Sequence, residues 1–419
     1  MNETKSLVAA RKVARGLRDA GREVWFVGGC VRDDLLGREP ADYDLVTSAR
    51  PEEVQRLFPR HVAIGKQFGV IGVLEGGLTV EVASFRTEAE YRDGRHPSAV
   101  GPATAEEDVR RRDFTINGLL MDPWTLEVVD LVGGKADLEA GVIRCIGEPA
   151  ERFAEDHLRI LRAVRFAARL DFVIEAKTAA AIKVAAPAAG TPSPERVKAE
   201  LERMWTEGGA ARALRMLRDL EVLPHVLPEL GATMSRSPEA RWNPEGVSFK
   251  SVLDRTQAVL AAAEGEELSP SVAWAIVLDD LVDGFPVPRS REARRVLERL
   301  HSSRDLMNKV EDLVRWRDRL VFATDVSRAR RRLVGAFRGL DALIEVHRLE
   351  GAVASSRRPE REWTALARAP LPPPSVDGRT LMAQGVAPGP ALGRALRRAR
   401  FIQLDAAAPP AGGAKSEES

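Results

Sequence analysis

Two aspartates separated by one residue are the clearest candidates for catalytic chemistry in this sequence of 419 residues. On an extended strand the side chains of Asp42 and Asp44 point to the same face, and neighbouring carboxylates repel each other unless a cation joins them. Ligand sets made only of oxygen suit magnesium. In the segment LTVEVASF, Val80 and Val82 point away from the face of Glu81, so this glutamate can complete a three-carboxylate cluster. Such a cluster can hold two metal ions.

An Asp-x-Asp pair alone is more typical of a turn with side-chain-to-backbone hydrogen bonds. The residues that precede Asp42 and Asp44 in the sequence favour the catalytic interpretation instead. Gly28 and Gly29 end a predicted strand and precede a predicted helix start. Glycines let the backbone approach phosphates, amides at a helix start point at the anion, and Arg32 adds a planar set of donors. A phosphate-binding turn is therefore predicted close to the aspartates.

A second group of charged residues occupies one predicted helix. Asp156 and Arg159 are i, i+3 neighbours and can present an acceptor beside a donor. Cytosine and adenine offer an amino donor beside a ring-nitrogen acceptor, whereas uracil and guanine reverse that order, so one Asp–Arg pair can admit CTP and ATP and reject UTP and GTP. A solvated helix face is the simpler alternative. It does not explain Arg162, Arg165 and Arg169 on the same helix, interleaved with apolar residues.

Strands that could position these groups are predicted only in the first 150 residues, where apolar runs of strand length occur. The pair Gly76-Gly77 predicts a hairpin turn. A mobile loop is predicted over 86–109, which is polar and contains Gly and Pro. Strands are predicted at 24–29, 42–46, 69–74 and 78–85.

After Pro149 nearly all of the sequence has apolar residues at helical spacing. The N-terminus is predicted to be a charged amphipathic helix, and the last fifteen residues, with few apolar side chains, are predicted to be disordered. Further helices are predicted at about 151–170, 194–206, 208–221, 249–263, 269–282, 290–300, 304–319, 325–350 and 390–404.

The composition is that of an ordinary globular protein, with 44% hydrophobic and 30% charged residues. The chain is too long for one compact core, so several domains are expected. Cys30 and Cys145 cannot form a disulfide framework, which favours a reducing cytoplasm. No signal peptide and no membrane-spanning apolar run are apparent. With 63 Lys+Arg against 62 Asp+Glu, net charge neither favours nor excludes nucleic-acid binding.

Five segments, in order along the chain, resemble the motifs of tRNA nucleotidyltransferases and bacterial poly(A) polymerases. They cover roughly the first half of the chain. GGCVRDDLLGREPADYDLVT resembles the opening motif of this family. The other four are RRRDFTINGLLMDP (110–123), VVDLVGGKADLEAGVIRCIG (128–147), EDHLRILRAVRFAARL (155–170) and SPERVKAELERMW (193–205).

The resemblance implies a role for each residue that matches a motif. Asp42 and Asp44 would bind two catalytic Mg²⁺ ions, and Glu81 would be the third carboxylate. The implied nucleotide-binding residues fall into four sets: the glycine turn and its arginine for the triphosphate, the second motif for ribose and phosphates, a base-reading pair, and two further triphosphate arginines. They are Gly28, Gly29 and Arg32; Arg112, Asp113 and Asn117; Asp156 and Arg159; and Arg162 and Arg165.

Three features favour the CCA-adding branch, of the class II type. Segment 61–74 is poorer in arginine than we expect of a poly(A) polymerase, and the C-terminus KSEES is short and slightly acidic rather than long and basic. In this family, enzymes that add only CC lack much of a loop that is intact here, with Tyr91, Arg92, Asp93 and Arg95. An enzyme that adds only the final A remains an alternative.

Two weaker resemblances concern the second half. Residues 245–283 resemble a region that carries a His-Asp phosphohydrolase site in some relatives, but no His-Asp dipeptide occurs in the sequence. A helical body without that activity is therefore expected. Residues 376–405 resemble a tail element of longer family members, which would bind the tRNA elbow.

The expected fold is α+β. A nucleotidyltransferase head with a small mixed sheet and helices (1–150) precedes an all-helical neck (151–222), body (223–320) and tail (321–404), with a disordered C-terminus (405–419). The expected activity is template-independent addition of CCA to tRNA 3′ ends from CTP and ATP, in the cytoplasm, with neither DNA nor a membrane as partner. Alternatives are an A-adding enzyme, a poly(A) polymerase acting on mRNA, and an inactive RNA-binding protein with this fold.

Overall fold

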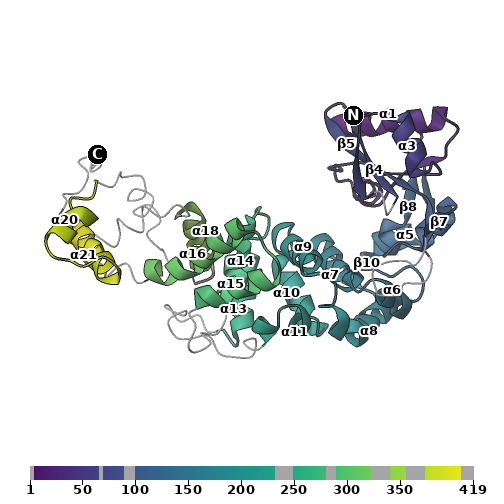
Figure 1. Ribbon diagram of the computed structural model, residues 1–419. Helices are drawn as coiled ribbons and strands as arrows, with labels where there is room; N and C mark the ends of the chain where they lie inside the picture. Colours follow the sequence, from purple (N-terminus) through teal and green to yellow (C-terminus); the bar gives the residue numbers. More distant parts are fainter. Residues whose placement is uncertain are drawn as a thin grey trace, which may run out of the picture. The chain divides into compact units, whose positions relative to one another are not determined.

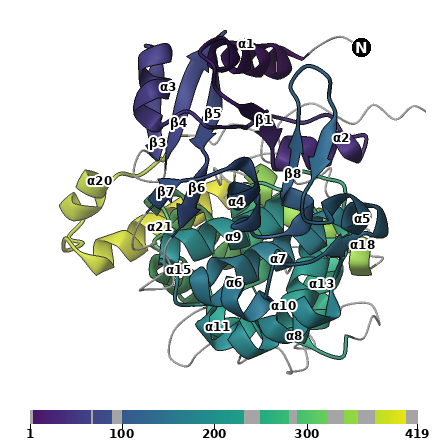
Figure 2. The ribbon, with the colours of Figure 1, turned by 90° about the vertical axis from the view of Figure 1, so that its right-hand side faces the viewer.

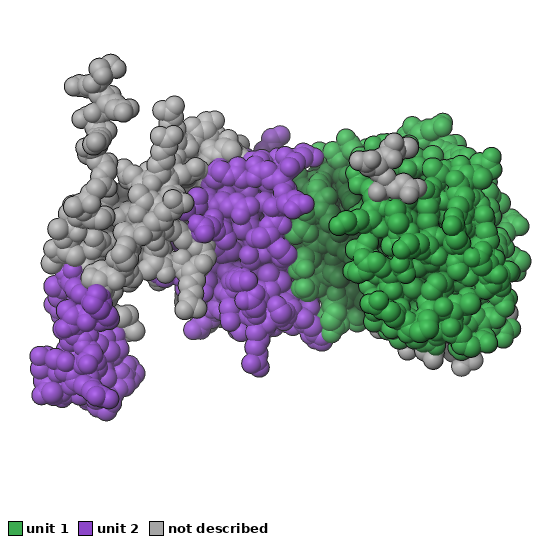
Figure 3. Space-filling view, turned by 90° about the horizontal axis from the view of Figure 1, so that it is seen from above, with its two compact units in different colours: residues 1–228 green, residues 229–419 purple. Residues whose placement is uncertain are grey.

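The chain forms two compact units, residues 1–228 (unit 1) and 229–419 (unit 2), shown in different colours in Figure 3. Their boundary lies near the predicted boundary between neck and body at 222–223, and the finer division into four domains stays a prediction. The computed structural model describes residues 4–65, 69–88, 100–231, 249–279, 289–321, 340–354 and 373–406.

A seven-stranded mixed sheet lies in the N-terminal part of unit 1, in the order β3-β4-β5-β2-β1-β8-β9. Only the β2–β5 pair is parallel among these described strands. The predicted β4–β5 hairpin is confirmed, with Gly76 and Gly77 both at positive φ, which glycine adopts readily. The strands are β1 (Val24–Val27), β2 (Leu45–Thr47), β3 (His61–Gly65), β4 (Val70–Glu75), β5 (Leu78–Ser84), β8 (Leu119–Met121) and β9 (Val128–Asp130).

Short helices pack on this sheet. Figure 2 shows α1 (Lys5–Asp19) and α3 (Pro51–Leu57) beside β4 and β5, which both helices contact. A buried cluster of Val27, Val46, Phe85, Val109 and Leu120 joins the sheet to α4. The remaining elements of this part are α2 (Gly29–Leu35), β6 (Arg86–Glu88), β7 (Val100–Pro102), α4 (Ala105–Arg110), η2 (Thr115–Asn117) and α5 (Gly134–Ala140).

The rest of unit 1 is mostly helical, as Figure 1 shows, and contains one short parallel pair of strands, β10 and β11. At its centre, α7 packs against both α9 and α10. The elements are β10 (Val142–Ile143), α6 (Pro149–Glu155), α7 (Leu158–Leu170), β11 (Val173–Ile174), α8 (Ala176–Ala185), η3 (Ala186–Ala188), α9 (Pro194–Thr206), α10 (Ala210–Asp219) and α11 (Leu223–Val226), and α12 (Pro228–Gly231) begins at the boundary.

In its described parts, unit 2 contains only helices. Residues 272–278 of α14 are all buried, and α14 contacts α13, α16 and α18. None of the described helices has the length and apolar character needed to cross a membrane. The helices are α13 (Val252–Ala262), α14 (Pro270–Leu278), α15 (Arg289–Arg299), α16 (Arg304–Val321), α18 (Leu340–Ala354), α20 (Gly378–Ala383) and α21 (Pro390–Ala406).

The predicted α+β class, with a mixed sheet followed by helices, is confirmed. Among the predicted boundaries that were wrong, two concern acidic site residues. The strand expected at 42–46 begins at Leu45, so both aspartates precede it. The single helix expected over 151–170 is interrupted at Asp156 and His157, where Asp156 Oδ1 accepts a hydrogen bond from the amide of Leu158, the first residue of α7.

The segment 86–109 is not simply a loop. It contains β6, β7 and nearly all of α4. Helix α4 begins with a capping box, in which Thr104 accepts from the Glu107 amide and Glu107 accepts from the Thr104 amide. The predicted loop residues Tyr91, Arg92, Asp93 and Arg95, and the predicted helical stretch 325–339, lie outside the described residues.

Candidate active site

A cavity of about 700 Å³ in unit 1 brings together most of the predicted site residues. Its wall comes from α2, the segment before β2, β6, the residues after α4, and helices α7 and α9, and it is dominated by arginine. The predicted residues that line it are Gly28, Gly29, Arg32, Asp44, Arg112, Asp113, Asn117, Asp156, Arg159 and Arg162. Wall residues without a predicted role are Arg86, Arg111, Phe166, Arg169, Arg196 and Arg203.

Of the three predicted carboxylates, Asp44 lines this cavity, whereas Asp42 and Glu81 are not among its lining residues. Asp44 extends the pairing of β1 and β2 by one residue, because its carbonyl accepts from the Val27 amide at 3.1 Å. The parallel β2–β5 register aligns Leu45 with Val82, which places Glu81 beside Asp44. Glu81 is exposed and its neighbours in β5 are buried, as the alternation predicted.

The electrostatics of Asp44 indicate a crowded anionic site. Burial, and then the nearby charges of Asp42 and Glu81, raise the pKa of Asp44 to about 7, while Arg112 acts in the opposite direction. No described residue forms an ion pair with these three carboxylates or donates a hydrogen bond to them. Arg112 therefore offsets only part of the repulsion at Asp44, whose pKa stays raised.

A divalent cation would relieve this repulsion. Within the described residues, no group of three Asp, Glu, His or Cys side chains lies close enough to hold a metal ion as it stands. The donor set nevertheless fits magnesium, because it consists only of carboxylate oxygens and carries excess negative charge at Asp44. Metal binding by Asp42 and Asp44 stays a prediction.

The glycine turn leads directly into α2. Gly28 has φ of 77° and is the N-cap of this helix, a conformation that favours glycine. Arg32 is buried, and its guanidinium donates to Asp33 Oδ1 and to Asn117 Oδ1, each at 2.8 Å. These contacts fix the guanidinium at the cavity wall, beside the turn that was predicted to bind phosphate.

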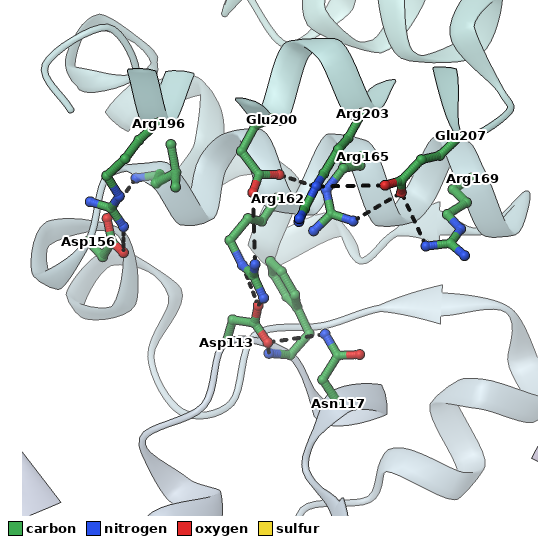
Figure 4. A network of polar contacts seen from close by, with 12 residues as sticks. Asp113, Asn117, Asp156, Arg162, Arg165, Arg169, Arg196, Glu200, Arg203 and Glu207 are labelled. Atoms are coloured by element: carbon green, nitrogen blue, oxygen red, sulfur yellow. Dashed lines mark hydrogen bonds and ion pairs between the residues drawn. The ribbon is translucent and has the colours of Figure 1, made fainter. Parts of the chain in front are cut away.

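Asp113 is the centre of a buried polar network that joins α7 to the segment after α4 (Figure 4). Its Oδ2 accepts from Arg162 Nε at 2.8 Å, and its Oδ1 accepts from the Asn117 side chain at 3.2 Å and from the Phe114 amide at 2.8 Å. Burial alone would raise the pKa of Asp113, but Arg162 and these hydrogen bonds lower it to about 2. This carboxylate is therefore ionised at neutral pH and acts as an acceptor.

Asp108 was not predicted, although it positions a predicted residue. It is buried, and Arg112 donates to it from Nε and Nη2 at 3.2 and 2.9 Å, while Arg111 binds its other oxygen. Burial would raise the pKa of Asp108, but Arg112 and Arg111 lower it. The signal in the sequence EEDVRRRD (106–113) was an acidic residue, just before the second motif, three and four positions ahead of two arginines that belong to that motif.

The structure corrects the argument for a base-reading pair on one helix. Asp156 lies between α6 and α7, where its Oδ2 accepts from Arg196 Nη2 at 2.8 Å. Arg159 donates instead to Glu155 Oε2 at 2.5 Å and to the carbonyl of Arg152 at 3.0 Å. Both predicted residues line the cavity, but each is bound to a different partner.

Arg165, predicted to approach a triphosphate, is not among the cavity-lining residues of the described chain. It is buried, and its Nε donates to Glu200 Oε2 at 2.6 Å. Glu200 also lies 3.9 Å from Arg162, so this glutamate ties α9 to two arginines of α7 (Figure 4). A direct contact of Arg165 with nucleotide stays a prediction, and the observed contacts give it a supporting position.

The unpredicted polar residues of α9 follow helical spacing. Arg196, Glu200 and Arg203 are separated by four and three residues and so share a face, which meets the arginines of α7. This spacing was visible in the motif SPERVKAELERMW. The partners of Arg196 and Glu200 were not visible, because Asp156 and Arg165 lie about forty positions earlier in the sequence.

Comparisons with known proteins match both parts of unit 1. The family model of the poly(A) polymerase head domain matches residues 24–144. A second model, described as the probable RNA and SrmB-binding site of polymerase A, matches residues 171–234. These ranges contain the glycine turn, the carboxylates and helices α8 to α11.

Curated relatives are CCA-adding enzymes. That of Bacillus pumilus is 44% identical over 202 residues, covering 48% of this chain and 50% of the relative. That of Bacillus cytotoxicus is 38% identical over 272 residues, covering 64% of this chain and 66% of the relative. The matched part thus spans about half to two thirds of the length of these relatives.

Solved structures resemble the chain over nearly its whole length. The crystal structure of the Bacillus stearothermophilus CCA-adding enzyme in complex with CTP aligns with a TM-score of 0.73 and 26% identity, covering 96% of this chain and 93% of that one. The Thermotoga maritima CCA-adding enzyme complexed with tRNA_CCA aligns with a TM-score of 0.62 and 22% identity, covering 97% and 93%. At that identity the second likeness concerns the fold alone.

Proposed function

Because the chain belongs to the family of tRNA nucleotidyltransferases and bacterial poly(A) polymerases, we propose that it adds the CCA end to tRNA 3′ termini from CTP and ATP. The observation that carries this proposal is one cavity with three kinds of group in its wall. They are a glycine turn suited to phosphates, a carboxylate of the anionic cluster, and the acceptor and donor side chains suited to a base.

In the proposed reaction the tRNA 3′ hydroxyl attacks the α-phosphate of the nucleotide and pyrophosphate leaves. Asp42 and Asp44, with Glu81 as the neighbouring carboxylate, would hold two magnesium ions. When bound, magnesium makes the hydroxyl a better nucleophile and offsets the charge on the leaving group. The raised pKa of Asp44 supports this role: burial is its largest cause, and the negative charges of Asp42 and Glu81 add to it where a cation would bind.

The triphosphate would lie along the glycine turn. Amides of Gly28 and Gly29 at the start of α2 suit a phosphate oxygen, and the fixed guanidinium of Arg32 lies beside them. Arg112 and Arg162 are each held by a buried aspartate, so they present positive charge from set positions. Preorganised donors of this kind stabilise charge that develops during phosphoryl transfer.

Base selection would occur at Asp156 and Arg159, at the part of the wall formed by the junction of α6 and α7. A carboxylate accepts hydrogen bonds from the amino group of cytosine or adenine, and it repels the carbonyl oxygen that uracil or guanine presents there. The choice would thus be made by protein side chains, without a nucleic-acid template.

We propose tRNA as the partner and the cytoplasm as the site of action. Support for RNA comes from the second family model, over 171–234, and from the arginines of α7 and α9 at the cavity. Binding through phosphates would weaken as salt concentration rises. The cytoplasm is supported by Cys30 and Cys145, which are both free and buried.

The test is incorporation of each single nucleotide, with magnesium, into tRNA transcripts that end before CCA, after C and after CC. Addition of C, then C, then one A is the expected result. Addition of A only to tRNA-CC would replace the proposal with an A-adding enzyme. An open-ended A ladder on any RNA would indicate a poly(A) polymerase, and no incorporation together with RNA binding would indicate an inactive protein with this fold.

A further inference from the structure

Arg196 is a wall residue of the cavity to which none of the preceding assignments gives a role. It lies in the first turn of α9, and 28% of its side chain is exposed. Its Nη2 donates to Oδ2 of Asp156 at 2.8 Å, and the two side chains face each other in Figure 4. Arg196 therefore joins α9 to the residue that is proposed to read the base.

Both oxygens of Asp156 are held. Oδ1 accepts from the Leu158 amide at 3.0 Å, and Oδ2 accepts from Arg196. One donor is a backbone group at the start of α7 and the other is a side chain of α9. Rotation of the carboxylate would break at least one of these bonds, so the remaining lone pairs point in set directions. A fixed acceptor discriminates between bases better than one that can rotate.

Arg196 donates to Asp156, and the guanidinium of Arg159 donates to Glu155 and to two backbone carbonyls. The Nη1 atom of Arg196 is buried and has no hydrogen-bond partner among the described residues. Buried donors are normally paired, so an unpaired one at a cavity wall is expected where a ligand completes the network.

We propose that Arg196 is the positioning residue of base selection: it holds the Asp156 carboxylate as a fixed acceptor for the amino group of cytosine or adenine. This inference rests on the proposed function, since it concerns the same pocket. Without Arg196 the carboxylate can turn or take up water, and a base with a carbonyl at that position meets less repulsion. Loss of Arg196 should therefore reduce discrimination more than it reduces the rate with the correct nucleotide.

The experiment compares Arg196→Met, which keeps much of the side-chain shape, with Arg196→Lys, which keeps the charge but loses the planar fork. Lys198→Met is the matched control, two residues further along α9 and outside the cavity wall. We measure kcat/KM for CTP and UTP on tRNA that ends before CCA, and for ATP and GTP on tRNA-CC. Arg196→Met should lower the CTP:UTP and ATP:GTP ratios by about tenfold or more, the loss of one charged hydrogen bond. The ratios of Arg196→Lys should lie between those of the unchanged chain and those of Arg196→Met. The control, Lys198→Met, should keep the ratios of the unchanged chain.

Unchanged ratios in Arg196→Met overturn the inference, and so does an equal fall for all four nucleotides, which would mean general structural support. If circular dichroism shows that Arg196→Met does not fold, the ratios of Arg196→Lys decide. Failure of the proposed function can be distinguished from failure of this inference, because the former already appears in assays of the unchanged chain. If the unchanged chain adds only A, the ATP:GTP ratio alone tests the role of Arg196. If the unchanged chain adds no nucleotide, the role of Arg196 is tested by equilibrium competition between CTP and UTP for binding.

Discussion

Arg162 of α7 binds Asp113 through two nitrogens: Nε and Nη2 lie 2.8 and 2.6 Å from the same oxygen, Oδ2. Asp113 is buried and follows the head-side helix α4, whereas α7 belongs to the helical part of unit 1. One ion pair thus fixes the orientation of a cavity-wall arginine and joins two structural parts. Its energetic role can be tested separately from catalysis.

Asp113→Asn should destabilise unit 1 by about 3 kcal/mol, because removing one partner of a buried ion pair leaves the other charge uncompensated. Urea unfolding followed by circular dichroism measures the change. Lys177→Met is the control, since it breaks an exposed ion pair with Glu148 that should contribute less than about 1 kcal/mol. Equal effects of the two substitutions would contradict the prediction.

The stability difference between the unchanged chain and Asp113→Asn should depend on pH. The pKa of Asp113 is lowered to about 2 in the folded state, so its contribution is fully present above the unfolded value of roughly 4. It is lost as pH falls from about 4 through 2. Unfolding free energies measured from pH 7 down to about pH 2 should therefore converge at the acid end. A difference that stays constant would show that Asp113 does not stabilise the fold through its charge.

Asp42→Ala should abolish nucleotide incorporation and leave tRNA binding largely in place. The exposed carboxylate of Asp42 lies at the anionic cluster and does not contribute to the buried core. Incorporation and tRNA gel-shift assays measure the two properties. Asp19→Ala, at the exposed end of α1, is the control and should retain both. Retained incorporation in Asp42→Ala would refute its proposed metal role.

Asp44→Asn should raise the melting temperature of the metal-free chain by a few degrees, since it removes one of three mutually repelling carboxylates. Magnesium should stabilise the unchanged chain by binding the folded state, and this increment should vanish in the variant. Thermal scans with EDTA and with magnesium measure both effects, with Asp19→Asn as the control. An equal magnesium increment in Asp44→Asn would place the cation elsewhere.

The sheet and its carboxylates were largely predictable because they depend on local rules. Alternation of polar and apolar residues in β5 was enough to put Glu81 on the face away from Val80 and Val82. The Gly-Gly pair was enough to predict the β4–β5 hairpin. The prediction started β2 at residue 42, whereas the strand starts at Leu45. The carbonyl of Asp44 accepts a hydrogen bond from the Val27 amide of β1, as a strand residue would, but Asp44 itself precedes the strand.

The partners of the arginines were not predictable, because they depend on the packing of α7 against α9. Spacing along one helix suggested that Asp156 pairs with Arg159, but α6 ends before Asp156 and a residue forty positions later supplies the ion pair. The sequence showed that polar residues of α9 share one face of the helix, but it did not show which residues that face contacts. Tertiary contacts of this kind decide which charges remain at the cavity for a ligand.

Arg159→Ala should relax the choice among the four nucleotides. Its guanidinium lines the cavity and is held there by Glu155 and by the carbonyls of Arg152 and Arg111, so its removal takes away a fixed donor next to the base. A charged hydrogen bond contributes about 1.5–3 kcal/mol, which predicts a fall of roughly tenfold to a hundredfold in the CTP:UTP ratio of kcat/KM.

The control for this prediction is Arg159→Lys, which keeps a charge but cannot reproduce the three contacts, so its CTP:UTP ratio should lie between those of the unchanged chain and Arg159→Ala. Part of any loss in rate will be structural, because Arg159 also holds the segment around Arg111. The ratio between nucleotides removes that part, since a looser wall slows all four alike. Unchanged selectivity in Arg159→Ala would exclude Arg159 from base reading and leave Asp156, fixed by Arg196, as the residue that selects the base.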